Sequence, residues 1–213
     1  MAERLLRRLG HHYILVMMIA TRLFGSIGGL LVIYYVELTS WEMPIQVRMH
    51  WRIASVVVVI IACALTVFLA MYETRSLRRV LRALIRGQAA DPAQAVQAGR
   101  EAVMFVSRHH RHEAWLVPCS TLVPVLIFLK VVDDVSATVM GNITIAVFMG
   151  ISMALMSTFF AIEHCMQPVI RCLLDHGDRI DYTSLPVGNL RFRLRLCFTL
   201  IIITTAMMIG TLA

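Results

Sequence analysis

Charged residues are scarce in this chain, and their scarcity excludes an ordinary water-soluble domain. Of the 213 residues only 15% are Asp, Glu, Lys or Arg, whereas 59% are hydrophobic, and the mean hydropathy is +0.75. A soluble domain is typically about 45–50% apolar. A chain with so little polar surface cannot cover itself in water, so the lipid bilayer is the first expected partner.

Catalytic motifs are missing as well. The sequence contains no G-x-S-x-G, no phosphate-binding loop, no C-x-x-C pair and no H-E-x-x-H. The segments between the apolar runs are too short for a separate catalytic domain. We therefore expect no catalytic residue and no cofactor in this chain, and any enzymatic activity would lie in a C-terminal part beyond it.

Five apolar runs are long enough to cross a bilayer, which needs roughly 20 residues. They cover residues 13–36, 53–72, 114–132, 143–162 and 196–213. The stretch 54–69 carries only Ser55 and Thr66 as polar residues, so it is apolar all round, unlike a helix of a soluble bundle. The expected fold class is all-α: a single polytopic membrane domain over residues 1–213 with about five transmembrane helices.

The basic residues gather in the gaps between these runs. Three arginines precede the first run, eight lie within 73–114 and five within 166–195. With five crossings these segments share one side, which the positive-inside rule makes cytoplasmic. We expect an inner (plasma) membrane protein with a cytoplasmic N-terminus. The same pattern argues that the net charge of +7 reflects topology and not nucleic-acid binding.

The segment 73–113 is predicted to be a cytoplasmic αα-hairpin. Leu77, Val80, Leu81 and Leu84 recur at helical spacing beside arginines, and Gly87 is a candidate helix end. A new start follows at Asp91, with Pro at the first helical position and Gln three residues on. This second helix, about 92–112, is expected to run into the third span. The short outer loops, about 37–51 and 133–142, contain Trp41 and Trp51 as expected interfacial anchors.

The densest polar cluster is His109-His110-Arg111-His112-Glu113. On a helix His109 and His112 share a face and Glu113 follows His109 by four residues, so the three are candidate metal ligands or a pH switch. The plainer interpretation is a solvated basic rim at the membrane. A haem site is disfavoured because the ligands would lie inside the spans, and the histidines nearest to the spans flank them: His11, His12, His50 and His164.

Arg22 lies about ten residues into the first span, where charges are costly and commonly functional. It is expected either to snorkel to the interface or to pair with Glu163 near the end of the fourth span. Glu163 and His164 are thus further candidate functional residues at the membrane edge. Gly25, Gly28 and Gly29 form a small-residue face that suits close helix packing.

Three stretches carry a family resemblance: TRSLRRVLRALIRGQAADPAQA, AIEHCMQPVIRCLLDHGD and LPVGNLRFRLRLCFTLIIITTAMMIG. The chain resembles the six-helix membrane input region of bacterial class III adenylate cyclases that carry a HAMP linker, and less closely that of related histidine kinases. The resemblance implies a sensor that passes a helix movement to a dimeric output. Five spans ending at a membrane edge then suggest that a sixth helix and the output follow.

Two hypotheses about the function follow from the sequence. The first is a membrane-embedded sensor or regulatory region of a signal-transduction protein, coupled to a nucleotide cyclase and acting as a homodimer or with other membrane proteins. The alternative is a structural or accessory transmembrane subunit of a larger photosynthetic or respiratory complex.

Overall fold

The computed structural model describes residues 2–39, 43–87 and 92–174, together with the single positions 198, 199, 202 and 205. Its elements are α1 (Ala2–Leu9), the 3-10 helix η1 (Gly10–His12), α2 (Tyr13–Thr39), α3 (Ile45–Glu73), α4 (Arg75–Ile85), α5 (Pro92–Asp133) and α6 (Ala137–Leu174). The described part has no strand, so the all-α prediction is confirmed there. The expected fifth span, 196–213, lies outside the described residues apart from those four positions.

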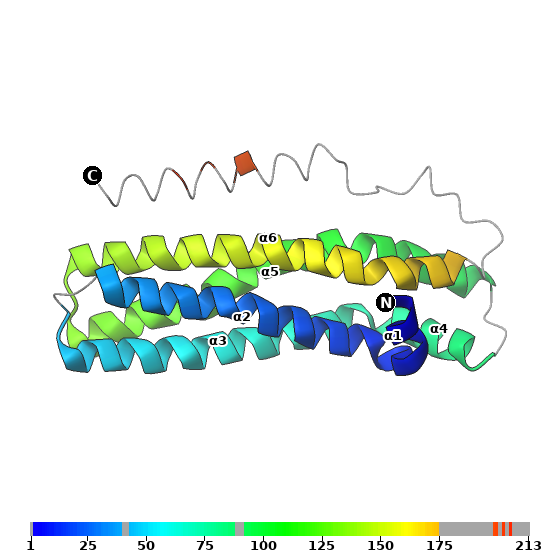
Figure 1. Ribbon diagram of the computed structural model, residues 1–213, viewed down its shortest axis with the longest axis horizontal. Coiled ribbons are helices and arrows are strands. Elements are labelled where there is room, and N and C mark those ends of the chain that lie inside the picture. The colour runs from blue at the N-terminus through cyan, green and yellow to red at the C-terminus, as the bar shows by residue number, and fades with distance from the viewer. Residues whose placement is uncertain are drawn as a thin grey trace.

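Four described helices are long and apolar enough to cross a membrane: Gly10–Thr39, Ile45–Glu73, Ala93–Asp133 and Ala137–Leu173. They lie lengthwise beside one another (Figure 1). Each of α2, α3, α5 and α6 packs on two of the others, which gives the ring α2–α3–α5–α6. In this ring α2 is diagonal to α5, and that arrangement determines which side chains meet at the centre.

The outer surface of the bundle is apolar. Large side chains such as Leu23, Phe24, Leu31, Ile60 and Phe68 are exposed. In water such a surface would promote aggregation, whereas in a bilayer lipid tails solvate it. The bundle is thus built for a membrane.

Two apolar clusters pack the bundle near its ends. At the end where α1 and α4 lie, the α4 end, the first cluster includes Tyr13, Leu77, Leu81, Phe105 and Val169. Near the opposite end the second cluster gathers Val36, Trp51, Leu129, Ile143 and Ala146. Arg22 and Glu113, described below, lie between these two clusters along α2 and α5.

The boundary between α3 and α4 is a single residue. Thr74 interrupts the helix, and its side-chain hydroxyl donates to the Ala70 carbonyl at 2.7 Å. Leu77, Val80 and Leu81 then bury one face of α4. The predicted end at Gly87 is confirmed, because α4 stops at Ile85 and Gly87 adopts φ +68°, a conformation that favours glycine.

α5 is one continuous helix of 42 residues. It begins at Pro92 as the sequence predicted, whereas the expected N-cap Asp91 lies outside the described residues. It continues through Pro118 and Pro124 to Asp133. The expected passage of the 92–112 helix into the third span is confirmed.

The connections opposite the α4 end are shorter than predicted. α3 already begins at Ile45 and α6 at Ala137, so the loops are smaller than 37–51 and 133–142. Trp51 is 1% exposed inside the second apolar cluster, so its expected interfacial role is wrong. Hydropathy identifies only the apolar part of a helix. The ends of a helix depend on backbone hydrogen bonds, which polar residues also make, so helices can extend beyond the apolar runs. Trp41 lies outside the described residues.

Candidate functional site

Arg22 and Glu113 form an ion pair across the centre of the bundle. The Nη1 group of Arg22 donates to Oε1 of Glu113, and the two residues are 7% and 2% exposed. Because α2 and α5 are diagonal in the ring, the pair spans the bundle axis. Charges held this far from water are costly unless paired, so each one depends on its partner.

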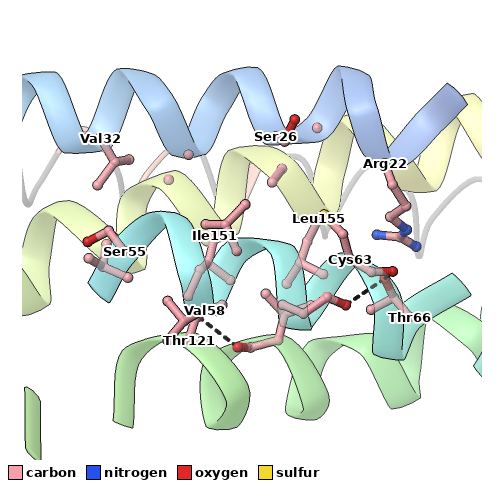
Figure 2. Close-up of a pocket in the computed structure, with 18 of the residues that line it drawn as sticks. Arg22, Ser26, Val32, Ser55, Val58, Cys63, Thr66, Thr121, Ile151 and Leu155 are labelled. Carbon is pink, nitrogen blue, oxygen red and sulfur yellow. Dashed lines mark hydrogen bonds between the residues drawn. The ribbon is translucent and has the colours of Figure 1, made fainter. Parts of the chain in front are cut away.

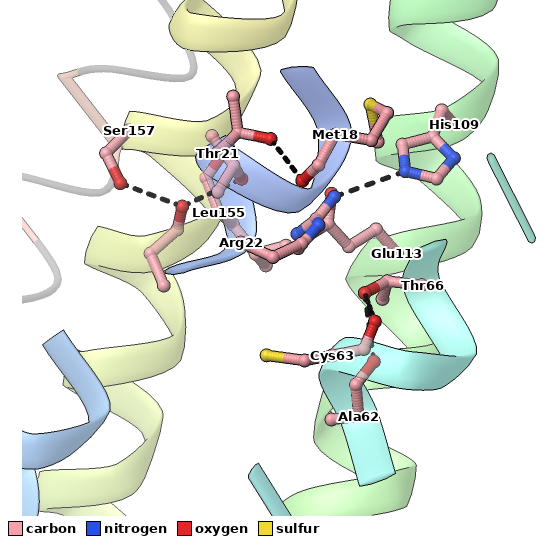
Figure 3. Close-up of polar contacts among 12 residues, drawn as sticks. Met18, Thr21, Arg22, Ala62, Cys63, Thr66, His109, Glu113, Leu155 and Ser157 are labelled. Atoms are coloured by element: carbon pink, nitrogen blue, oxygen red, sulfur yellow. Dashed lines mark hydrogen bonds and ion pairs between the residues drawn. The ribbon is translucent and has the colours of Figure 1, made fainter. Parts of the chain in front are cut away.

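His109 extends this pair toward α3. The Nη2 group of Arg22 lies 3.2 Å from His109 Nε2, and His109 Nδ1 lies 2.7 Å from Glu73 Oε2. Since a guanidinium only donates, Nε2 accepts and Nδ1 carries the proton that it donates to Glu73. This hydrogen bonding fixes a neutral His109 between an arginine and a carboxylate (Figure 3 shows the Arg22 side).

Glu73 collects three side chains of α5. Besides His109, its carboxylate is 2.7 Å from His112 Nδ1 and 3.6 Å from Arg108 Nε. Arg108 also donates to the Glu73 backbone carbonyl at 3.2 Å. We name the sequence Glu113, Arg22, His109, Glu73 and His112 the polar chain. It joins α2, α3 and α5 and includes Glu73, the last residue of α3.

The polar chain corrects two expectations drawn from the sequence. The acidic partner of Arg22 is Glu113, so neither snorkelling nor pairing with Glu163 describes this buried arginine. Glu163 is half-buried and His164 is exposed on α6. Sequence reasoning missed Glu73 as a central residue, although its place at the end of an apolar run was a usable signal.

The proposed metal ligands do not converge. His109 and His112 both face Glu73, whereas Glu113 faces Arg22. Within residues 2–39, 43–87 and 92–174 no group of three or more His, Cys, Asp or Glu side chains is placed to hold a metal ion. The alternative interpretation of segment 109–113 as a solvated basic rim is also only partly correct. His109, His110 and Glu113 are buried, while Arg111 and His112 are exposed.

A partly open cavity of about 120 Å³ lies beside the polar chain and is lined by α2, α3, α5 and α6. Arg22 and Glu113 line it, and apolar and small side chains form most of its wall. In Figure 2 Arg22 and Ser55 lie toward opposite ends of the pocket. The bundle therefore has a hollow, mostly apolar centre that meets buried charge at one end.

Glycines bring the helices around this cavity close together. A Cβ on Gly25 would lie 3.1 Å from Thr158 of α6, and one on Gly29 would lie 3.5 Å from Val59 of α3. A Cβ on Gly28 would meet nothing within 4 Å. The closest approach is at Gly150 of α6, where a Cβ would clash with Val32 of α2. The small-residue face predicted in α2 thus includes two packing positions, and Gly150 was missed.

Three further charged contacts lie opposite the α4 end. His50 Nδ1 is 2.8 Å from Asp133 Oδ1, and Arg52 pairs with Glu37. Lys130 Nζ lies 2.6 Å from Asp134 Oδ1, and this hydrogen bond lowers the pKa of the Asp134 carboxyl. These pairs are more exposed than the polar chain, so each is worth little. The buried polar chain and its cavity are the stronger candidate site.

Comparisons with known protein families, with curated proteins and with solved structures found no match to this chain.

Proposed function

We propose that this chain is the membrane-embedded sensor, or input region, of a signal-transduction protein. The observation that carries the proposal is the position of Glu73. It ends α3, stands next to the Thr74 break before α4, and receives His109 and His112 from α5. A change at Arg22 or Glu113 in the bundle centre can therefore reach α4 through contacts of at most 3.2 Å beyond the ion pair.

The cost of the polar chain supports a functional role. Breaking a buried ion pair leaves an uncompensated charge and costs about 3–5 kcal/mol, whereas well-packed apolar residues would serve stability equally well or better. A bundle that needed only stability would gain nothing from Arg22 and Glu113. A switch, by contrast, needs a bistable element that a local charge or packing change can bias.

The α4 end is the cytoplasmic side in this proposal, with α4 and the first part of α5 forming a cytoplasmic helical hairpin. Four exposed arginines support this orientation, namely Arg75, Arg79 and Arg82 of α4 and Arg86 directly after it. The positive-inside rule assigns such a segment to the cytoplasm. The N-terminus, which packs at the same end, is then cytoplasmic and the membrane is the plasma membrane.

The output of the sensor is proposed to be a nucleotide cyclase acting as a dimer. The sequence resemblance to HAMP-linked adenylate cyclases supports this part of the proposal. The mass of the polypeptide made from the native gene tests it: a chain well above 24.0 kDa with cyclase activity is expected. A native chain of 24.0 kDa that co-purifies with a respiratory or photosynthetic complex would favour the accessory-subunit alternative.

Hydrogen–deuterium exchange of the chain in lipid nanodiscs tests the coupling itself. In Glu113→Gln we expect amide exchange in α4 to rise about tenfold, which corresponds to about 1.4 kcal/mol of easier opening. Asp134→Asn, an exposed carboxylate at the far end, is the matched control and should change nothing in α4. Because Glu113→Gln alone could unfold the bundle, the double variant Arg22→Leu/Glu113→Leu removes both charges together. Unchanged α4 exchange in both variants would contradict the proposal.

A further inference from the structure

The cavity in the bundle centre is lined by residues whose buried polar atoms have no partner among the described residues. Four of its lining residues carry one each: Nε1 of Trp51, Oγ of Ser55, Nε of Arg22 and Oε2 of Glu113. All four residues are at least 93% buried. Buried polar groups are nearly always hydrogen-bonded, and each exception needs an explanation such as a ligand.

Ser55 is an exception among the hydroxyls around the cavity. Ser26, Thr66, Thr121 and Thr158 each donate to a carbonyl of their own helix at 2.7–2.9 Å. Helical Ser and Thr commonly satisfy themselves in this way. Ser55 does not, although it is 5% exposed. Its hydroxyl is therefore free to bind a group in the cavity.

The two unpartnered groups farther from the polar chain are both able to donate. Trp51 Nε1 is a donor only, and the Ser55 hydroxyl can also donate. A ligand oxygen that accepts hydrogen bonds, such as a carbonyl oxygen, would satisfy both. A hydrocarbon without such an oxygen would leave both buried donors unsatisfied.

Charge and shape define the rest of the ligand. The charges that line the cavity are Arg22 and Glu113, which neutralise each other, so a charged ligand would be uncompensated. From Ser55 to Thr66 the cavity follows eleven residues of α3, about 16 Å at 1.5 Å per residue. A volume of about 120 Å³ spread over such a length describes a long, narrow cavity, which favours a chain-shaped ligand.

We propose that this cavity is a binding site for a slim, uncharged, single-chain lipid-like molecule with a carbonyl oxygen. The carbonyl accepts hydrogen bonds from Ser55 and Trp51, and the chain lies along the small residues toward Arg22 and Glu113. The role of this molecule as the signal of the sensor rests on the proposed function, because only an input region needs a signal ligand. Binding itself is measurable without any output.

Photolabelling of the chain in phosphatidylcholine nanodiscs tests the proposal. The probe is decan-2-one carrying a mid-chain diazirine, and mass spectrometry identifies the labelled residues. We expect labels on the cavity-lining face of α3 and α6, between Ser55 and Thr66 and between Gly150 and Thr158. Unlabelled decan-2-one should compete, whereas decane and decanoate should compete at least about tenfold less well.

Matched variants separate the cavity from the lipid-facing surface. Ala62→Leu fills the cavity and should reduce labelling about tenfold, whereas Ala64→Leu on the exposed face of the same helix should not. Ser55→Ala should weaken competition by the ketone, and Thr121→Val, which removes a hydroxyl already bonded to its helix, should not. Equal competition by decane would overturn the carbonyl assignment. Labelling confined to lipid-facing residues would overturn the site.

The outcomes distinguish this proposal from the proposed function. Specific labelling together with unchanged α4 exchange in Glu113→Gln would leave a binding site without a sensor. Altered α4 exchange without specific labelling would leave a sensor whose ligand is not this one. Only the combination of specific labelling and altered α4 exchange supports both.

Discussion

At the scale of single residues, the Arg22–Glu113 pair decides how the centre of the bundle is organised. Each side chain is buried, and each has one hydrogen-bonding atom that no described group satisfies. The pair is therefore less than fully compensated within the described residues. Such a pair contributes less to stability than its contacts suggest, and its loss on one side is severe.

A double-mutant cycle measures this asymmetry. Arg22→Leu and Glu113→Leu should each lower the free energy of unfolding by about 3 kcal/mol or more, because each leaves a buried charge alone. The double variant should lose much less than the sum, since neither charge remains. Unfolding in mixed micelles, followed by circular dichroism, gives the three values. Additive losses would show that the two residues do not interact.

Gly150 provides a second test at a single position. A Cβ there clashes with Val32, whose β-branched side chain has little freedom to move away. Gly150→Ala should therefore destabilise the bundle by about 1–3 kcal/mol, and Val32→Ala should restore most of that loss. Gly141→Ala on the same helix meets nothing within 4 Å and should be close to neutral. Thermal unfolding measures all three, and a neutral Gly150→Ala would contradict the close approach.

The residues of the site were only partly predictable from the sequence. Arg22 stands out because a charge within an apolar run is rare. Its partner depends on the ring order of the helices, which places α5 diagonally opposite α2 and brings Glu113 to the centre. Local spacing grouped Glu113 with His109 and His112 as metal ligands. In the bundle the two histidines face Glu73, whereas Glu113 faces Arg22.

At the scale of elements, the hydropathy of the sequence predicted the long helices but not the residues at which they begin and end. Residues 45–51 include Arg48 and His50, so the sequence placed them in the loop of about 37–51, although α3 begins at Ile45. Side-chain partners explain the extension: His50 bonds Asp133, Arg52 pairs with Glu37, and Arg48 Nε donates to the Met43 carbonyl at 3.1 Å. These contacts allow polar residues to continue an otherwise apolar helix.

The orientation of these helices is testable by cysteine labelling. In a background without native cysteines, Arg82→Cys on α4 and Gln46→Cys at the start of α3 both place an exposed thiol outside the apolar centre. In intact cells a membrane-impermeant maleimide should label Gln46→Cys and leave Arg82→Cys unmodified until the cells are lysed. The reverse pattern would show that the positive-inside assignment is wrong for this chain.

At the scale of the whole molecule, the bundle combines two packed ends with a hollow, partly polar centre. The first apolar cluster fixes α1 and α4 against the bundle, and the second fixes the opposite end. Between them lie the Arg22–Glu113 pair and part of the cavity, where buried polar atoms have no hydrogen-bond partner among the described residues. A bundle with well-packed ends and unsatisfied polar atoms between them is suited to a conformational change in which one end moves relative to the other.

The distance between α4 and the adjacent end of α6 tests the central claim most directly. Spin labels at Arg82→Cys and Gln167→Cys, both exposed, report this distance by double electron–electron resonance in nanodiscs. The account predicts one narrow distribution for the otherwise unaltered chain and a shifted or broadened one when Glu113→Gln or Arg22→Leu/Glu113→Leu is added, with Asp134→Asn unchanged. Identical distributions in all four proteins would contradict the claim that the polar chain couples the bundle centre to α4.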